Sequence, residues 1–254
     1  MMTIDIITLF PEFFEQFVQT SIIKKAILKG FVQVRFVPLR FFSQDKNKRV
    51  DDYPTGGGAG LIIQCQPVID AINSVKTPQS KVYLLSASGK KYTQNMAKQL
   101  SLESHIILIC GHYEGVDARV LNYVDGEICI GDYILTGGEI AAMAVADSII
   151  RLVDGVISSP SIEEESFENG LLEYPQYTFP REYQNHKIPD ILFSGNHQAI
   201  AEWRFKQSYL KTLQNRPDLL KEKQFNQKEQ QLIQELEDDS KQQIAIEKAK
   251  KFMK

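Results

Sequence analysis

Cysteine is scarce in this sequence, and long apolar runs are absent from it. The 254 residues include only three cysteines, Cys65, Cys110 and Cys129, too few and too scattered for a disulfide framework. No stretch reaches the roughly 18 apolar residues that a membrane-spanning helix needs. The first residues enter a structured pattern without a basic segment, so we expect no signal peptide. These absences predict a cytoplasmic protein that does not contact a membrane.

Common nucleotide-binding and metal-binding spacings are missing as well. Gly89-Lys90 is followed by Lys91 and lacks the upstream glycine of a phosphate-binding loop, and no Gly-x-Gly-x-x-Gly occurs. The sequence is therefore not that of a standard ATPase or dinucleotide-dependent dehydrogenase. The four histidines and three cysteines show no zinc-ligand spacing. Nothing in the sequence nominates the members of a Ser-His-Asp triad.

The charge balance leaves the kind of partner open. The composition is 43% hydrophobic and 24% charged, with a formal net charge of −3, as in an ordinary globular protein. A negative net charge disfavours nucleic-acid binding, which needs local positive charge. However, lysines and arginines gather within residues 24–49 and again within 204–216. Such clusters fit either a nucleic-acid contact or solvated helix faces.

Short apolar runs alternate with helical patterns over the first part of the chain. The runs rich in branched residues predict strands at Ile4–Phe10, Phe31–Val37, Val82–Ser86, His105–Cys110 and Glu127–Gly131. Helical periodicity predicts helices at Pro11–Leu28, Gln66–Ser74, Thr93–Leu100, Asp117–Asn122 and Gly138–Arg151. This alternation is typical of an α/β domain with a mostly parallel sheet.

The pattern changes near residue 158 and predicts a second domain. A small, polar and acidic segment is typical of a linker, which we place at residues 158–172 between an α/β domain at 1–157 and a helical domain at 173–254. In the second domain, helical patterns cover Ala199–Leu213 and the charged, Gln-rich segment Leu219–Lys254.

Glycine-bearing turns follow three of the predicted strands, at Leu85–Gly89, Cys110–Asp117 and Ile130–Glu139. Ligands of open α/β sheets bind outside the carboxyl ends of the strands, so three such turns in succession predict one shared pocket. A fourth glycine-rich segment, Gly56–Gly60, permits either a flexible turn or close approach of a ligand to the backbone.

At these residues the chain resembles the bacterial tRNA (guanine-N1)-methyltransferase family, of the knotted SPOUT class. The resemblance runs along nearly the whole chain, through Ile6–Pro11, Val50–Pro54, Gly56–Gly60, Cys110–Asp117, Ile130–Glu139, Asp147–Arg151, Ser166-Phe167, Pro175–Thr178, Leu192–His197 and Trp203-Arg204. The resemblance implies a deep trefoil knot, which physical reasoning from sequence would not propose because knots are nearly absent from folds.

The same resemblance implies that the three turns form the knot and hold S-adenosylmethionine. The cofactor-binding positions that it implies are Leu85, Ser86, Gly111, Tyr113, Ile130, Gly131, Asp132, Tyr133, Ile134, Leu135 and Gly138. It also implies a homodimer in which both chains build each active site.

The chemistry of guanine methylation indicates which further groups to expect. The N1 atom carries a proton that must leave while negative charge builds on O6, so the reaction needs a carboxylate base and a cation. The resemblance places the cation at Arg151 and the base at Glu165, with Glu164 as second choice. The family normally has aspartate at the base position. The resemblance also implies Mg²⁺, acting through charge stabilisation rather than in a dedicated protein cage.

Contacts to tRNA are expected from both domains. The resemblance places Asp51, Asp52 and Glu114 around the target base and its neighbour, and we expect Arg204 and Lys206 to hold the tRNA. Two alternatives stay open at this point. One is an RNA-binding protein that has lost catalysis together with the aspartate, and the other is a SPOUT methyltransferase acting on rRNA or on a ribose hydroxyl.

Overall fold

The chain forms two compact units. The computed structural model describes residues 1–158 and 164–238, which belong to a first unit, Met1–Ser158, and a second unit, Ser159–Lys254. Glu163, part of the acidic run, and the segment 239–254 lie outside the described residues. Within the described ranges, every helix is too short or too polar to span a lipid bilayer.

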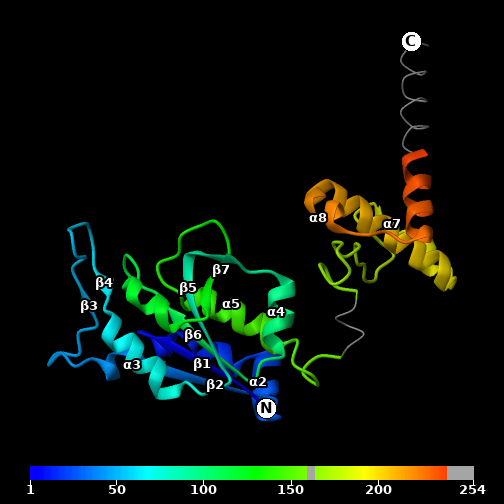
Figure 1. The fold of residues 1–254 in the computed structure, drawn as a ribbon. Helices are drawn as coiled ribbons and strands as arrows, with labels where there is room; N and C mark the ends of the chain where they lie inside the picture. Colours follow the sequence, from blue (N-terminus) through cyan, green and yellow to red (C-terminus); the bar gives the residue numbers. More distant parts are fainter. Residues whose placement is uncertain (159–163, 239–254) are drawn as a thin grey trace. The chain divides into compact units, whose positions relative to one another are not determined.

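A five-stranded parallel sheet forms the centre of the first unit (Figure 1). Its strands are β1 (Met2–Thr8), β2 (Val32–Pro38), β5 (Ser80–Lys91), β6 (His105–Cys110) and β7 (Gly126–Cys129), in the order β2-β1-β6-β5-β7. All four pairings are parallel, which confirms the predicted α/β class with a parallel sheet. The carboxyl ends of the strands therefore lie at one edge of the sheet.

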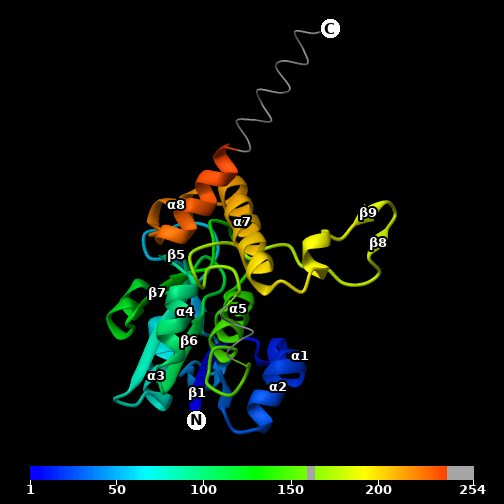
Figure 2. The same ribbon diagram turned by 90° about the vertical axis from the view of Figure 1, so that its right-hand side faces the viewer.

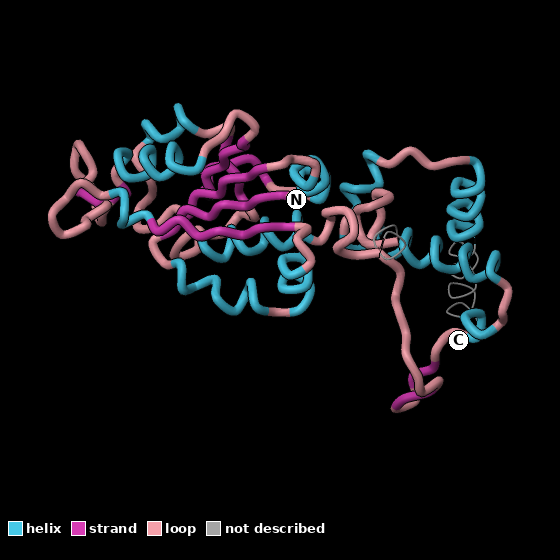
Figure 3. The backbone as a smooth tube through the Cα atoms, turned by 90° about the horizontal axis from the view of Figure 1, so that it is seen from below, coloured by secondary structure: helices cyan, strands magenta, loops and turns pink. Residues whose placement is uncertain are grey.

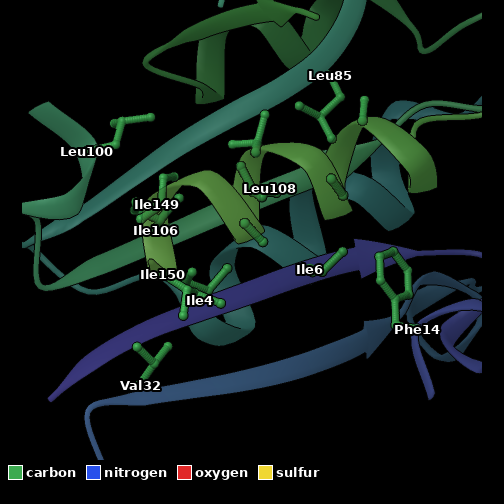
Figure 4. Close-up of a cluster of buried hydrophobic side chains, with 14 of the residues drawn as sticks. Ile4, Ile6, Phe14, Val32, Leu85, Leu100, Ile106, Leu108, Ile149 and Ile150 are labelled. Atoms are coloured by element: carbon green, nitrogen blue, oxygen red, sulfur yellow. The ribbon is translucent and has the colours of Figure 1, made fainter. Parts of the chain in front are cut away.

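Both faces of this sheet are apolar because helices cover both of them (Figure 3). Every residue of β6 is buried, and its side chains alternate between the two faces. Ile106 and Leu108 pack against α5 (Glu139–Ile150) and its neighbours, as Figure 4 shows. Ile107 and Ile109 pack on the other side, where α3 (Cys65–Val75) lies. Burial on both faces explains the continuous apolar run in the sequence.

Shorter elements complete the first unit. These are the 3₁₀ helices η2 (Leu39–Phe42) and η3 (Ala118–Tyr123), the helix α4 (Gln94–Ser101), and an antiparallel pair of two-residue strands, β3 (Asp51–Asp52) and β4 (Ile62–Ile63). The helix predicted at Asp117–Asn122 is a 3₁₀ helix in the structure. The Asp117 carboxylate caps it by accepting the backbone N–H of Arg119 at 2.9 Å.

One predicted helix, Pro11–Leu28, is broken into three pieces. The structure has η1 (Pro11–Phe14), α1 (Glu15–Gln19) and α2 (Ser21–Leu28) in its place. Thr20 is extended, and its hydroxyl donates to the carbonyl of Gln16 at 2.6 Å. Its carbonyl accepts the N–H of Lys24 at 3.2 Å. Thr20 therefore closes one helix and opens the next, which helical periodicity alone does not reveal.

The strand predicted at Val82–Ser86 extends further in the structure, to Lys91. The pairing of β5 with β7 is interrupted between Leu85 and Lys90, and Lys90 and Lys91 then pair with Ile128 and Cys129. The intervening segment thus leaves the sheet at the carboxyl end of the strand and returns to it. This long-range pairing was not visible in the local sequence pattern.

The second unit is mainly helical among its described residues. It contains a two-residue hairpin, β8 (Glu182–Tyr183) with β9 (His186–Lys187), that projects from the unit in Figure 2. The 3₁₀ helix η4 (Asp190–Phe193), α7 (His197–Asn215), α8 (Pro217–Glu222) and a helical stretch over residues 227–238 follow. The Asn196 side chain caps α7 by accepting the N–H of Ala199 at 3.2 Å.

The predicted helical segment Leu219–Lys254 is interrupted over residues 223–226. Asn226 and Glu229 cap the helical stretch that starts after the break, because each side chain accepts the backbone N–H of the other residue, at 2.9 and 2.8 Å. This reciprocal pair is a capping box, which satisfies donors at a helix start and favours a new helix there. The part of the prediction beyond residue 238 lies outside the described residues.

Candidate functional site

A cavity of about 510 Å³ opens at the carboxyl ends of the central strands. It is lined by the segments that follow β6 and β7 and by the segment where β5 leaves the sheet. Ten of the eleven predicted cofactor positions line it: Leu85, Ser86, Gly111, Tyr113, Ile130, Gly131, Tyr133, Ile134, Leu135 and Gly138. The three turns predicted to share one pocket therefore do line one cavity. Their role in cofactor binding stays a prediction.

Backbone contacts between two of these loops shape the cavity. The N–H of Gly138 donates to the carbonyl of Gly111 at 2.7 Å. A Cβ at residue 138 would lie 2.7 Å from the Cα of Cys110, closer than real Cβ atoms approach a backbone. Only glycine permits this contact, so the wall of the cavity is set by the main chain.

The lining of the cavity suits a compact ligand that carries positive charge. Glu114 and Glu127 contribute carboxylates, and the Glu127 carboxylate also accepts a hydrogen bond from Ser88 at 3.1 Å. The lining set contains neither lysine nor arginine, so the site does not suit a triphosphate. The sulfonium and amino groups of S-adenosylmethionine are cations, and its adenine can bind to the exposed backbone groups of these loops, so the residues fit this cofactor.

Asp132 is the predicted cofactor residue that does not line the cavity. Its side chain is 87% exposed, and its carboxylate lies 3.7 Å from the Nζ of Lys91. An exposed pair of this kind holds its side chains weakly. The backbone of Asp132 is part of the loop, but its side chain points away from the cavity.

The three acidic residues predicted around the target base occupy different environments. Asp51 is buried in β3, whereas Asp52 is exposed and accepts the N–H of Tyr53 at 2.8 Å. Glu114 lines the cavity, and its N–H donates to the carbonyl of Leu61 at 3.0 Å. Glu114 therefore links the glycine-rich segment to the cavity, while Asp51 lies in the core.

A buried polar group lies behind the cavity wall, and the sequence reasoning missed it. Glu139, the first residue of α5, is 5% exposed, and its carboxylate accepts the hydroxyl of Thr8 at 2.9 Å. Burial raises the pKa of the nearby Cys110 thiol well above its usual range, and the charge of Glu139 raises it further. An acidic residue at the start of an expected helix was the available signal, but it is common at helix N-termini.

The two predicted catalytic residues belong to different units. Arg151 directly follows α5 in the first unit, is half-buried, and donates its N–H to the carbonyl of Asp147 at 3.0 Å. Glu165 lies in the second unit, where it lines a further cavity of about 400 Å³. Their joint action on one base stays a prediction.

Glu164, the alternative base, is held by two neighbours in the second cavity. Its carboxylate accepts hydrogen bonds from the hydroxyl of Tyr174 and, at 3.3 Å, from a terminal nitrogen of Arg204. The guanidinium carbon of Arg204 lies 4.7 Å from the centroid of the Tyr174 ring. Burial and the hydrogen bond to Glu164 raise the pKa of Tyr174 to about 12.

The two predicted tRNA contacts on α7 both take part in ion pairs. Arg204 pairs with Glu164, and the Nζ of Lys206 lies 2.8 Å from a carboxylate oxygen of Glu235. The Nε of Arg204 is buried and lacks a partner in the part of the chain that the structure describes. The ring centroids of Trp203 and Tyr177 lie 6.4 Å apart.

No group of three or more potential ligand residues that could hold a metal ion occurs within residues 1–158 and 164–238. Asp5, Arg35 and His105 form a connected group of charged and titratable side chains. The Asp5 carboxylate accepts hydrogen bonds from both Arg35 and His105. Asp5 is fully buried at the end of the sheet where β5 and β6 begin. A cation here would have to compete with the guanidinium, so the group is a structural network.

The fold and cavity define an α/β protein with a cavity formed by loops at the carboxyl edge of a parallel sheet. Comparison with known proteins specifies the family. Residues 2–222 match the family model described as tRNA (Guanine-1)-methyltransferase TrmD, and the chain belongs to this family. The match covers both units, including the segment that carries Glu165.

Several curated proteins are similar to the chain over most of their length. A protein of Malacoplasma penetrans is 55% identical over 86% of this chain and 96% of its own length. One of Geobacillus kaustophilus is 50% identical over 93% and 98%, and one of Dictyoglomus turgidum is 48% identical over 96% and 100%. Each is named tRNA (guanine-N(1)-)-methyltransferase.

Proposed function

We propose that this chain transfers the methyl group of S-adenosylmethionine to N1 of the guanosine that follows the anticodon of tRNA. The observation that carries the proposal is that a chain of the tRNA (guanine-1)-methyltransferase family has its predicted cofactor residues around one cavity. The cofactor supplies an electrophilic methyl group when bound. The loops that follow β5, β6 and β7 would hold it, with backbone groups contacting the adenine.

Glu165 is the base in this proposal and Arg151 the cation. Glu165 removes the proton from guanine N1, and Arg151 stabilises the negative charge that develops on O6. Glu164 is the second choice, and its carboxylate accepts hydrogen bonds from Tyr174 and Arg204. Glu165 is longer than the family's usual aspartate by one methylene group, a change that the adjoining chain must accommodate.

The proposal includes a knotted chain, a dimer and a bound metal. The close contact between Gly138 and the end of β6 is compatible with one segment passing beside another in a trefoil knot. Two chains would then complete each active site, so that Glu165 of one chain serves a cofactor held by the other. Mg²⁺ would stabilise developing charge near the base, and Arg204 and Lys206 would exchange their present carboxylate partners for tRNA phosphates.

Nucleoside analysis of the reaction product tests the proposal. The purified chain is incubated with S-adenosylmethionine, Mg²⁺ and an unmodified tRNA, and the digested tRNA is separated and identified by mass spectrometry. The proposal predicts 1-methylguanosine, with no product when the guanosine after the anticodon is replaced by adenosine. A methylated ribose, or methylation of rRNA only, would instead support a different SPOUT activity.

A single-turnover assay tests the assignment of the base. Glu165→Ala should slow methyl transfer by about 10³-fold, within the range typical of a lost general base, and leave cofactor affinity unchanged. Glu164→Gln is the matched control and should slow it by less than about tenfold, since its amide still accepts hydrogen bonds. Full activity of Glu165→Ala, or equal losses in both variants, would contradict the assignment.

A further inference from the structure

One oxygen of the buried Glu139 carboxylate behind the cavity wall has a defined hydrogen-bond partner. Thr8 Oγ1, at the end of β1, donates to Oε1 of Glu139 at 2.9 Å. Thr8 is itself fully buried, and its hydroxyl also accepts the N–H of Phe10 at 3.0 Å. Thr8 thus fixes the direction of the carboxylate, and the second oxygen, Oε2, points toward the loop that contains Gly137.

His112 presents a matching group from the loop after β6. It lines the cavity, and its ring packs edge-on against the rings of Phe10 and Tyr113, with centroid distances of 5.1 and 4.9 Å. Its Nδ1 is buried and has no hydrogen-bond partner within the described part of the chain. A buried ring nitrogen without a partner is costly, so such an atom calls for an explanation.

Gly137 places the two groups next to each other. A Cβ at residue 137 would lie 2.4 Å from Oε2 of Glu139 and 2.6 Å from Nδ1 of His112. His112 and Gly137 also form an antiparallel bridge between their loops. The absence of a side chain at residue 137 therefore leaves the line between the carboxylate and the imidazole open, and any other residue would close it.

We propose that Glu139 is a positioning residue for the cofactor: its carboxylate, oriented by Thr8, accepts the Nδ1–H of His112 across Gly137 when the cofactor binds. This bond locks the loop after β6 to the loop after β7, and both loops line the cavity. It satisfies the buried nitrogen and fixes the spacing that the ligand requires. The inference rests on the proposed function, because it assumes that this cavity holds S-adenosylmethionine.

The other polar side chains near Glu139 and His112 are not alternative partners for Nδ1 of His112. The Cys110 thiol is a weak donor, and its raised pKa keeps it neutral. Thr8 is already committed to Glu139 and to the N–H of Phe10. Since Glu139 does not line the cavity, it acts on the ligand through His112 rather than by touching it.

Calorimetric titration of the full-length chain with S-adenosylmethionine tests this inference. Glu139→Ala and His112→Phe should each weaken binding about tenfold, the loss of one charge-assisted hydrogen bond. The double variant should be no weaker than either single variant, because both remove the same bond. Glu139→Gln should restore binding to within about threefold of the wild type, since the amide oxygen still accepts.

Asp5→Asn provides a matched control, because Asp5 is also a buried carboxylate but binds Arg35 and His105 at the other end of the sheet. It should lower the melting temperature without changing cofactor affinity. The ring nitrogens of His112, assigned in a ¹⁵N spectrum with the help of His112→Phe, should report a protonated, hydrogen-bonded Nδ1 only when cofactor is present.

Wild-type affinity in folded Glu139→Ala or His112→Phe, additive losses in the double variant, or an equal loss in Asp5→Asn would overturn the inference. These outcomes differ from a failure of the proposed function. A wild-type chain that binds the cofactor but does not methylate guanosine contradicts the function, and the titrations would still decide the role of Glu139. A wild-type chain that does not bind it contradicts both.

Discussion

The two cavities of this chain are built by different means. In the first unit, main-chain contacts define the cavity, and it rests on a sheet whose residues are buried on both faces. In the second unit, the ion pair of Arg204 with Glu164 lines the cavity, Arg204 also lies over the Tyr174 ring, and both members of the pair are partly exposed. The main-chain contacts of the first cavity are already made without a ligand, whereas the ion pair of the second can exchange its partners.

This difference agrees with the ligands that the proposed function assigns to the two cavities, S-adenosylmethionine and tRNA. A small cofactor gains affinity when its pocket is already formed, because binding then orders few groups. A large polyanion gains affinity from charges that release counterions, and these charges must be able to leave their internal partners. We therefore expect substitutions that disturb the main chain to weaken cofactor binding in the first unit. In the second unit, we expect changes of single side chains to alter tRNA binding or stability.

The largest effect on cofactor binding is expected for Gly138→Ala. The new methyl group would meet the Cα of Cys110, and overpacking of this kind costs about 1–3 kcal/mol. Affinity for S-adenosylmethionine should fall by up to about 100-fold in a titration of the folded variant. Ser88→Ala in the same cavity removes only a side chain and should change it by less than about threefold. Similar losses in both variants would show that the main chain does not dominate this site.

A smaller effect is expected for Thr212→Val in the second unit. The hydroxyl of this fully buried residue accepts the N–H of Leu172 at 2.8 Å and donates to the carbonyl of Ser208 at 2.6 Å. Its loss leaves a backbone donor unpaired, at a cost of about 1–2 kcal/mol in unfolding free energy. Denaturant unfolding measures this cost, and Asn215→Ala, on the exposed part of the same helix, is the control. Weakened cofactor binding in Thr212→Val would contradict the separation of the two sites.

Arg204→Lys should have a modest effect on tRNA alone. The substitution keeps the charge but loses the planar contact with Tyr174, so tRNA affinity should fall about three- to fivefold. Filter binding at several salt concentrations should give a slope close to that of the wild type, because the charge is retained. An equal loss of cofactor affinity would contradict the assignment of Arg204 to tRNA binding alone.

The smallest effect concerns two tyrosines whose pKa is about 12 for different reasons. Burial raises the pKa of Tyr92 in the first unit, while burial and the bond to Glu164 raise that of Tyr174 in the second. Both values exceed the ordinary value of about 10, so each phenol stabilises its folded unit below pH 10 and loses that contribution as pH rises toward 12.

Absorbance titration of tyrosinate separates the two cases. Glu164→Gln should lower the pKa of Tyr174 and leave that of Tyr92 unchanged, with Tyr92→Phe and Tyr174→Phe identifying each signal. A shift of Tyr92 in Glu164→Gln, or none in Tyr174, would contradict the stated causes.

Some parts of the molecule could be predicted from sequence because their cause is local or general. Strand β6 was predicted at its observed bounds, since burial on both faces leaves an unbroken apolar run. The grouping of three loops around one cavity followed from the rule that the loops at the carboxyl ends of parallel strands lie together. The break at Thr20 and the capping box at Asn226 depend on single side-chain hydrogen bonds that periodicity does not detect.

Other parts depend on contacts between distant residues. The hydrogen bond between Thr8 and Glu139 joins residues 131 positions apart, so neither residue carries a local signal of it. The return of β5 to pair with β7 and the outward direction of the Asp132 side chain are likewise set by the folded chain. The catalytic assignments came from family resemblance, because a surface arginine and an acidic run are chemically unremarkable by themselves.

Primer extension on tRNA after reaction tests the central claim most directly. The chain is incubated with S-adenosylmethionine and a tRNA that carries guanosine after the anticodon, and reverse transcriptase is then run toward that base. Because N1-methylguanine cannot form Watson–Crick pairs, the account predicts a cofactor-dependent stop beside this base, strongly reduced with Glu165→Ala. If reverse transcriptase reads through tRNA treated with the wild-type chain, although the chain binds the cofactor, the account is contradicted. The chain would then be a protein that binds the cofactor without methylating this guanosine.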